Sequence, residues 1–297
     1  MTWSTARRGF TLIELLISLI VSAIVGGALV RMVLSQARFM DQQEAYRGAR
    51  STARGGLNRL LSDLRTVEAS GGLEAAAAGG QDFTIRVPYA WGLMCSNTTG
   101  VLTTLSLLPV DSAMFAAPGF SGFAWRNSAT GAYTYQTAAV SLTTPGTPGN
   151  CTAAVPVPVT ILPSINGSPA GQTINVGGAV PLAALGGPPV GSIFFLFRRV
   201  RYEFKASTAL PGRTGLFRTM MSGGAAEEIA TPFANTARVN FYVLNATPAQ
   251  SAVPGTLGNT RGLELVLDGM SERTPGGSAT PKTASVTTSV FFENRPD

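Results

Sequence analysis

The chain has 297 residues, a net charge of +6, two cysteines and no histidine. Only 13% of its residues are charged, about half the usual share for a soluble domain. The lack of histidine excludes catalytic triads, general bases and metal sites that use imidazole, and two cysteines cannot supply a four-thiolate zinc site. We therefore expect no enzymatic activity and no cofactor or metal site.

The first predicted element is an apolar helix over residues 10–30, which contain one charge, Glu14. A helix of this length spans about 31 Å, enough to cross the hydrocarbon core of a bilayer. Arg7 and Arg8 precede it, and because positive residues stay in the cytoplasm, the rest of the chain is expected on the periplasmic side. A signal peptide has the same charge order, but no Ala-x-Ala cleavage site follows, so the segment is predicted to be retained.

Glu14 is unusual in such a segment. An acidic side chain inside a spanning helix costs about 2.5–3.5 kcal/mol on insertion scales, so it normally has a partner. One explanation is a carboxylate at the membrane interface, close to the start of the helix, where negative charge is favoured. The other is an ion pair with a cationic group of a neighbouring molecule.

The residues around Glu14 resemble the processing motif of type IV prepilins: Arg7-Arg8-Gly9-Phe10-Thr11-Leu12-Ile13-Glu14, a basic leader and Gly followed by Phe-Thr-Leu-Ile-Glu. The resemblance implies a leader peptide at residues 1–9, cleaved after Gly9 by an inner-membrane prepilin peptidase. It also implies N-methylation of Phe10. In this family the glutamate at the position of Glu14 pairs with the new amino terminus of a neighbouring subunit.

The helix is expected to continue as an amphipathic half over residues 31–72, because no proline occurs between Phe10 and Val87. An apolar stripe follows steps of three and four residues: Tyr46, Ala49, Ala53, Leu57, Leu60, Leu64 and Val67. Between these lie Arg47, Arg50, Arg54, Arg59, Asp63 and Arg65, which we interpret as a solvated face rather than a nucleic-acid site. Gly71-Gly72 is the predicted end of the helix.

Residues 81–297 are predicted to form a β-rich periplasmic domain. Apolar and polar residues alternate at 83–87, 200–204, 239–243, 263–267 and 286–292, and Pro88 is expected to end the first of these strands. Strands joined by polar loops without helical spacers favour antiparallel pairing. The predicted fold class is α+β, with the amphipathic half of the helix packed on one face of an antiparallel sheet.

Residues 89–190 are predicted to be an insertion or decorated loop region, since they are poor in charge and contain Gly/Pro clusters. Cys95 and Cys151 lie in this segment. In an oxidising periplasm they are expected to form one disulfide, and the alternative is two buried free thiols.

The order of the C-terminal segments also resembles the larger minor pilins and pseudopilins, through Gly215-Leu216-Phe217-Arg218, Glu227-Glu228-Ile229-Ala230 and a final strand ending in Phe292-Glu293-Asn294-Arg295. The resemblance implies a PilW-like minor pilin, a structural subunit that helps to initiate or cap a pilus. Its expected partners are prepilin peptidase, other major and minor pilin subunits, and the inner membrane. One alternative is a J-type minor pseudopilin of a type II secretion system. Another, of a different class, is a single-pass membrane adhesin or ligand-binding module.

Arg198, Arg199 and Arg201 are the remaining candidates for contact with DNA. The alternation of the segment instead indicates that Arg199 and Arg201 form the solvated face of a strand, and that Arg198 ends a hydrophobic run. DNA binding is thus an open alternative without further support from the sequence.

Overall fold

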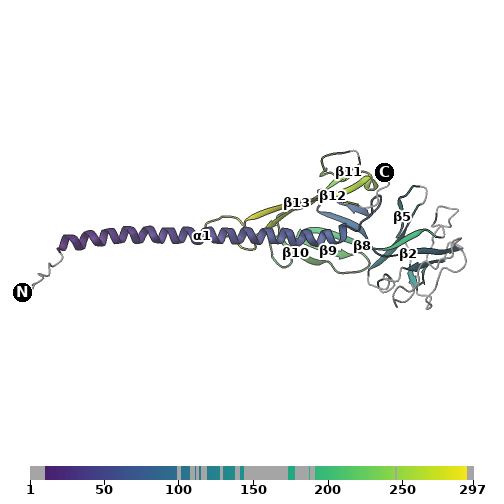
Figure 1. Cartoon of the computed structure of the whole chain (residues 1–297), viewed down its shortest axis with the longest axis horizontal. Coiled ribbons are helices and arrows are strands. Elements are labelled where there is room, and N and C mark those ends of the chain that lie inside the picture. Colours follow the sequence, from purple (N-terminus) through teal and green to yellow (C-terminus); the bar gives the residue numbers. More distant parts are fainter. Residues whose placement is uncertain are drawn as a thin grey trace, which may run out of the picture.

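The described part of the chain is built from one long helix and one antiparallel sheet, which confirms the predicted α+β class (Figure 1). The structure, a computed structural model, describes residues 11–98, 102–107, 111, 114, 119–127, 130–137, 141–143, 173–177, 187, 191–244 and 246–292. Helix α1 spans Leu12–Leu64. Its first half projects away from the sheet, and its second half lies against it (Figure 1).

The sheet contains all of the described strands. These are β1 (Leu73–Ala76), β2 (Asp82–Thr98), β3 (Leu102–Leu107), β4 (Phe120–Arg126), β5 (Tyr133–Gln136), β6 (Ser141–Thr143), β7 (Thr173–Gly177), β8 (Ile193–Ala206), β9 (Thr214–Met220), β10 (Glu227–Phe233), β11 (Arg238–Val243), β12 (Thr260–Met270) and β13 (Thr283–Phe291). The main order is β11-β12-β10-β9-β8-β2-β3-β7-β6. In addition, β13 pairs with β12, β1 with β2, and β4 with both β5 and β8. A short 3₁₀ helix, η2 (Leu257–Asn259), precedes β12.

The main core lies between the second half of α1 and strands β10, β12 and β13. The helix contributes Ala49, Ala53, Gly56, Leu60 and Leu64 as buried residues. The alternating leucines of β12, Leu263, Leu265 and Leu267, are fully buried in the same cluster. The predicted apolar stripe is therefore the packing face of the helix along most of its length, although Tyr46 at its start is 48% exposed.

Small residues allow α1 to approach β12 very closely. A Cβ atom added to Gly269 would lie 2.1 Å from the carbonyl oxygen of Ala49 and 3.1 Å from the Cβ of Ala53. Both obstacles belong to the packed helix, so neither can move aside without shifting the backbone.

Gly269→Ala is therefore expected to lower the free energy of unfolding by about 1–3 kcal/mol, the usual cost of overpacking a core. Gly255→Ala is the matched control, because a Cβ at Gly255 meets no atom within 4 Å. Denaturant unfolding of the full-length protein in detergent measures both variants. Equal stability of the two would show that the helix does not pack this tightly on β12.

The helix ends earlier than predicted, at Leu64 rather than at Gly71-Gly72. After Leu64 the backbone tightens, because the N–H of Thr66 donates to the Asp63 carbonyl and that of Val67 to the Leu64 carbonyl. Val67 stays in the core without being helical. The two glycines instead serve the turn into β1: Gly71 has a φ of +129°, and a Cβ at Gly72 would lie 2.2 Å from the Glu68 carbonyl oxygen.

Two expectations about the middle of the chain are wrong. Pro88 does not end a strand, because β2 continues to Thr98 and a register shift between Pro88 and Ala90 accommodates the proline. Residues 89–190 are also not simply a loop region, since their described parts include the second half of β2 and strands β3 to β7, which extend the same sheet. Gly- and Pro-rich composition concealed these strands.

Candidate assembly site

The N-terminal end of α1 is closed by a capping box. The Glu14 carboxylate accepts hydrogen bonds from the backbone N–H and the hydroxyl of Thr11, both at 3.0 Å, and the N–H of Glu14 donates to the Thr11 hydroxyl at 3.4 Å. The single acidic residue of the apolar segment is thus held at the positive end of the helix dipole. Gly9 and Phe10, the predicted cleavage and methylation positions, lie outside the described residues.

The first half of α1 exposes an almost continuous apolar surface. Leu12 is 83% exposed, Ile24 67% and Met40 70%, and no residue of the most apolar stretch of the helix is buried against the rest of the chain. This stretch has a mean hydropathy of 2.4, and α1 is long and apolar enough to cross a membrane. A surface of this size needs lipid or other apolar helices around it.

The C-terminal end of α1 is fastened to the sheet by a polar group that we call the Asp63 cluster: Asp63, Tyr202 of β8 and Arg218 of β9. Asp63 Oδ2 accepts hydrogen bonds from the Tyr202 hydroxyl at 2.6 Å and from Nε and Nη2 of Arg218 at 3.1 and 3.0 Å. The Tyr202 residue is fully buried, and the side chains of Asp63 and Arg218 are only 17% and 25% exposed. Burial, reinforced by the adjacent carboxylate, raises the pKa of Tyr202 well above its usual range. Burial alone would lower the pKa of Arg218, but the Asp63 carboxylate raises it overall.

The placement of Asp63 on a solvated face was therefore wrong. The sequence did contain one signal, because Asp63 is the only acidic residue among the five arginines of that face. A lone opposite charge in such a stripe indicates a specific partner. The partners of Asp63 could not be identified from local pattern, because Tyr202 lies 139 positions and Arg218 155 positions further along the chain.

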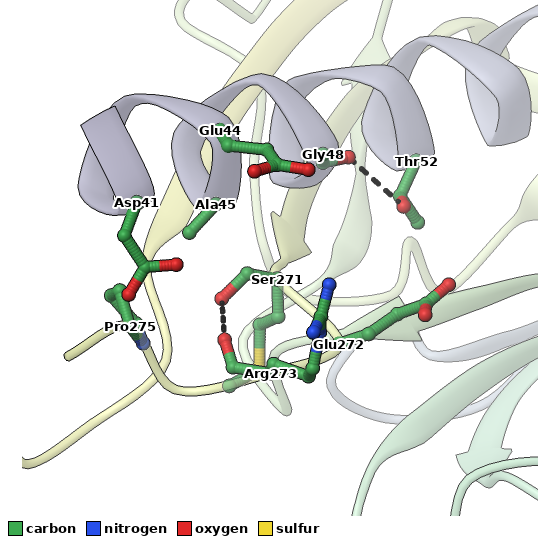
Figure 2. Close-up of a pocket in the computed structure, with 10 residues that line it drawn as sticks. Asp41, Glu44, Ala45, Gly48, Thr52, Ser271, Glu272, Arg273 and Pro275 are labelled. Atoms are coloured by element: carbon green, nitrogen blue, oxygen red, sulfur yellow. Dashed lines mark hydrogen bonds between the residues drawn. The ribbon is translucent and has the colours of Figure 1, made fainter. Parts of the chain in front are cut away.

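The segment that follows β12 lies along α1 near the point where the helix leaves the domain (Figure 2). The Asp41 carboxylate accepts a hydrogen bond from the N–H of Gly276, and Ser271 bonds to the Arg273 carbonyl at 2.7 Å. A small cavity lies between α1 and this segment. It is lined by the acidic Asp41, Glu44 and Glu272 and by the cationic Arg273. Within the described ranges, no set of three His, Cys, Asp or Glu side chains is arranged to hold a metal ion.

The three arginines considered for DNA all have partners. Arg199 Nε donates to Glu74 at 2.7 Å, and Arg201 donates to both oxygens of Asp82 at 2.8 and 2.5 Å. The guanidinium of Arg198 lies 4.3 Å from the centre of the Tyr89 ring. Because Arg199 and Arg201 are already paired with carboxylates, they offer less cationic charge to the phosphate backbone of DNA than free arginines would.

The predicted disulfide involves one described position. Cys95 belongs to β2, and Cys151 lies outside the described residues. The pairing of Cys95 with Cys151 stays a prediction.

Comparison with known proteins gives a match at the N-terminal end of the chain. A family model described as the prokaryotic N-terminal methylation motif matches residues 4–30. The match covers residues 4–9 of the predicted leader, together with Phe10 and Glu14, and it includes the capped start of the exposed apolar helix. Searches against curated proteins and against solved structures gave no match.

The N-terminus of the chain is therefore type IV prepilin-like, which confirms the resemblance of residues 7–14 to the prepilin motif. The resemblance of the C-terminal segments to minor pilins stays a prediction. The motif implies processing by prepilin peptidase and assembly with other pilins. The long helix suits a single-pass membrane anchor, and both the motif and the fold indicate a structural protein.

Proposed function

We propose that the protein is a minor type IV pilin, a structural subunit that helps to initiate or cap a pilus filament after removal of residues 1–9. The observation that carries the proposal is the methylation motif at the head of a helix whose first half is exposed and apolar. Lipid covers this surface before assembly, and the helices of neighbouring subunits cover it in the filament.

The geometry of Glu14 suits an exchange of partners during assembly. Before assembly its carboxylate is satisfied by the two donors of Thr11. In the filament it pairs with the methylated amino terminus of the neighbouring subunit's Phe10, a cation that is itself costly to place in hydrocarbon. Each charge offsets the desolvation of the other, and the pair also sets the register between helices that could otherwise slide.

The size of the domain favours a minor position. The sheet extends past the C-terminal end of α1, where β5 and parts of β2 and β8 lie beyond the helix (Figure 1). A domain of this bulk would crowd a lattice repeated along a whole fibre, whereas a subunit at low copy number near the tip has room. The type II pseudopilin alternative uses the same helix and processing site, and the genes beside this one would distinguish the two systems.

The proposal predicts the protein in sheared surface filaments at a small fraction of the copy number of the major subunit. Quantitative mass spectrometry of purified filaments measures this ratio. Deletion of the gene should reduce the number of filaments per cell while leaving the major subunit in the membrane. Complete retention in the membrane of piliated cells, with normal filament number after deletion, would favour the adhesin or ligand-binding alternative.

A further inference from the structure

The last strand of the sheet, β13, has one free edge. It pairs with β12 from Thr283 to Phe291 without any register shift. The bonds at the two ends of this ladder fix its phase, because the N–H of Phe292 donates to Arg261 and the N–H of Ser271 donates to Lys282. Hydrogen-bonded and non-hydrogen-bonded pairs alternate in an antiparallel ladder, so the even-numbered residues of β13 bond to β12.

The odd-numbered residues of β13 consequently direct their N–H and C=O groups away from β12: Thr283, Ser285, Thr287, Ser289 and Phe291. In the part of the chain that the structure describes, none of these backbone groups has another strand to pair with. The edge presents a row of unused donors and acceptors along nine residues.

This edge lacks the usual protection against a further strand. Sheet edges that must stay free normally carry a charged residue, a proline, a bulge or a very short strand. The sequence Thr283-Ala-Ser-Val-Thr-Thr-Ser-Val-Phe291 contains no charge and no proline, and its pairing has no bulge. It therefore has the features of a strand that is covered by a partner.

A basic groove runs beside this edge. Tyr46, Arg50 and Arg54 of α1 line it on one side, and residues 284–287 of β13 line the other. Arg50 and Arg54 are exposed, and neither side chain has an ion pair or hydrogen bond to another described residue. They are four positions apart on the helix, where like charges repel, so a carboxylate placed in the groove would relieve an existing cost.

We propose that the free edge of β13 accepts an extended, carboxylate-bearing strand of a neighbouring filament subunit by β-strand addition. The odd-numbered backbone groups bond to the added strand, and its acidic side chain pairs with Arg50 and Arg54. The identity of the donor as a filament subunit rests on the proposed function. The hydrogen bonds and the groove would select the partner by shape and by charge.

The β13 strand of a second copy of this chain is a poor donor. If two copies pair antiparallel through their β13 edges, the copies are related by a two-fold axis perpendicular to the sheet. Because α1 packs flat on the sheet, this axis would reverse one α1 relative to the other (Figure 1). The two apolar segments could not then enter the same membrane. The residues of β13 itself would also bring no negative charge to the groove.

Residue-level hydrogen exchange of the full-length protein tests strand addition. The amides of Ser285, Thr287 and Ser289 are expected to exchange quickly in detergent micelles and more than about tenfold more slowly in purified filaments. The amides of Val286 and Thr288, which bond to β12, should be slow in both samples. This internal comparison separates strand pairing from general crowding, because crowding does not distinguish odd from even residues.

Two pairs of variants locate the interaction. Thr287→Pro removes one outward N–H but no bond to β12, whereas Thr287→Val keeps that N–H. Arg50→Glu combined with Arg54→Glu reverses the groove charge, and Arg47→Glu changes an exposed arginine of the same helix that does not line the groove. Thr287→Pro and the double reversal should each reduce recovery in filaments about tenfold or more relative to their controls, with the even-numbered amides still protected in micelles.

Each outcome has a distinct meaning. If the odd-numbered amides exchange equally fast in micelles and in filaments, strand addition is overturned and the proposed function is not affected. Protection of these amides already in micelles shows that the edge is covered within the chain, and it overturns the proposal. Normal recovery of the double reversal overturns the acidic partner. Absence of the unmodified chain from filaments overturns the proposed function and, with it, the donor named here.

Discussion

Glu14→Gln is expected to insert into the membrane and to be processed normally, yet to enter filaments about 100-fold or more less efficiently. A glutamine can still occupy the third position of the capping box, so the start of α1 is preserved. Insertion should not suffer, because a neutral amide costs less to desolvate than a carboxylate. What is lost, under the proposed assembly contact, is the counter-charge for the amino terminus of the next subunit, and an uncompensated buried charge costs about 3 kcal/mol or more. The ratio of variant protein in sheared filaments to protein in the membrane measures the effect.

Thr11→Ala is the matched control for this experiment. It removes the capping hydroxyl that bonds to Glu14 but keeps the carboxylate, and the loss of a cap costs about 1 kcal/mol. Its filament incorporation should therefore fall far less than that of Glu14→Gln. Equal incorporation of Glu14→Gln and the unmodified protein would show that the carboxylate is only an interfacial residue.

Asp63→Ala should have the largest effect on stability, with a loss of about 3 kcal/mol in the free energy of unfolding. The substitution removes the acceptor for the Tyr202 hydroxyl and for Arg218 together. Both are then left with unsatisfied polar groups at the contact between α1 and the sheet, and a partly buried guanidinium loses its counter-charge. Denaturant unfolding of the full-length protein in detergent measures the change.

Arg59→Ala is the control for Asp63→Ala, since Arg59 lies one turn earlier on the same helix and is exposed. Its effect should stay within about 0.5 kcal/mol. Asp63→Asn, which keeps an acceptor oxygen but loses the charge, should fall between the two. A loss below about 1 kcal/mol for Asp63→Ala would mean that the Asp63 cluster contributes little to holding the helix on the sheet.

The parts of the fold that could be predicted from sequence depend on local pattern. The motif around Glu14 is contiguous, the stripe from Ala49 to Leu64 follows helical periodicity, and the strand near Leu263–Leu267 follows strict alternation. Each of these signals lies within one continuous stretch of sequence. The helix stripe and the strand match the structure, and the motif matches the family model. The candidate assembly site is of the same kind, because its chemistry is concentrated in one short segment.

The parts that escaped prediction depend on contacts between distant segments. The bonds from Asp63 to Tyr202 and Arg218, and the close approach of Gly269 to Ala49, join residues that no local window contains. The strands of residues 89–190 were missed for a different reason. Two of them, Tyr133–Gln136 and Thr173–Gly177, do alternate, but they are only four and five residues long and lie among stretches rich in glycine and proline. The bulge at Pro88 also allows β2 to continue where a proline usually ends a strand.

The most direct test of the assignment to the prepilin class is the mass of the mature N-terminus. The protein should be isolated from membranes of cells with an active prepilin peptidase, digested, and its N-terminal peptide sequenced by mass spectrometry. We expect a peptide that begins at Phe10 with a methylated α-amino group and no trace of residues 1–9. A peptide that still begins at Met1, or an unmethylated terminus at any other position, would contradict the assignment.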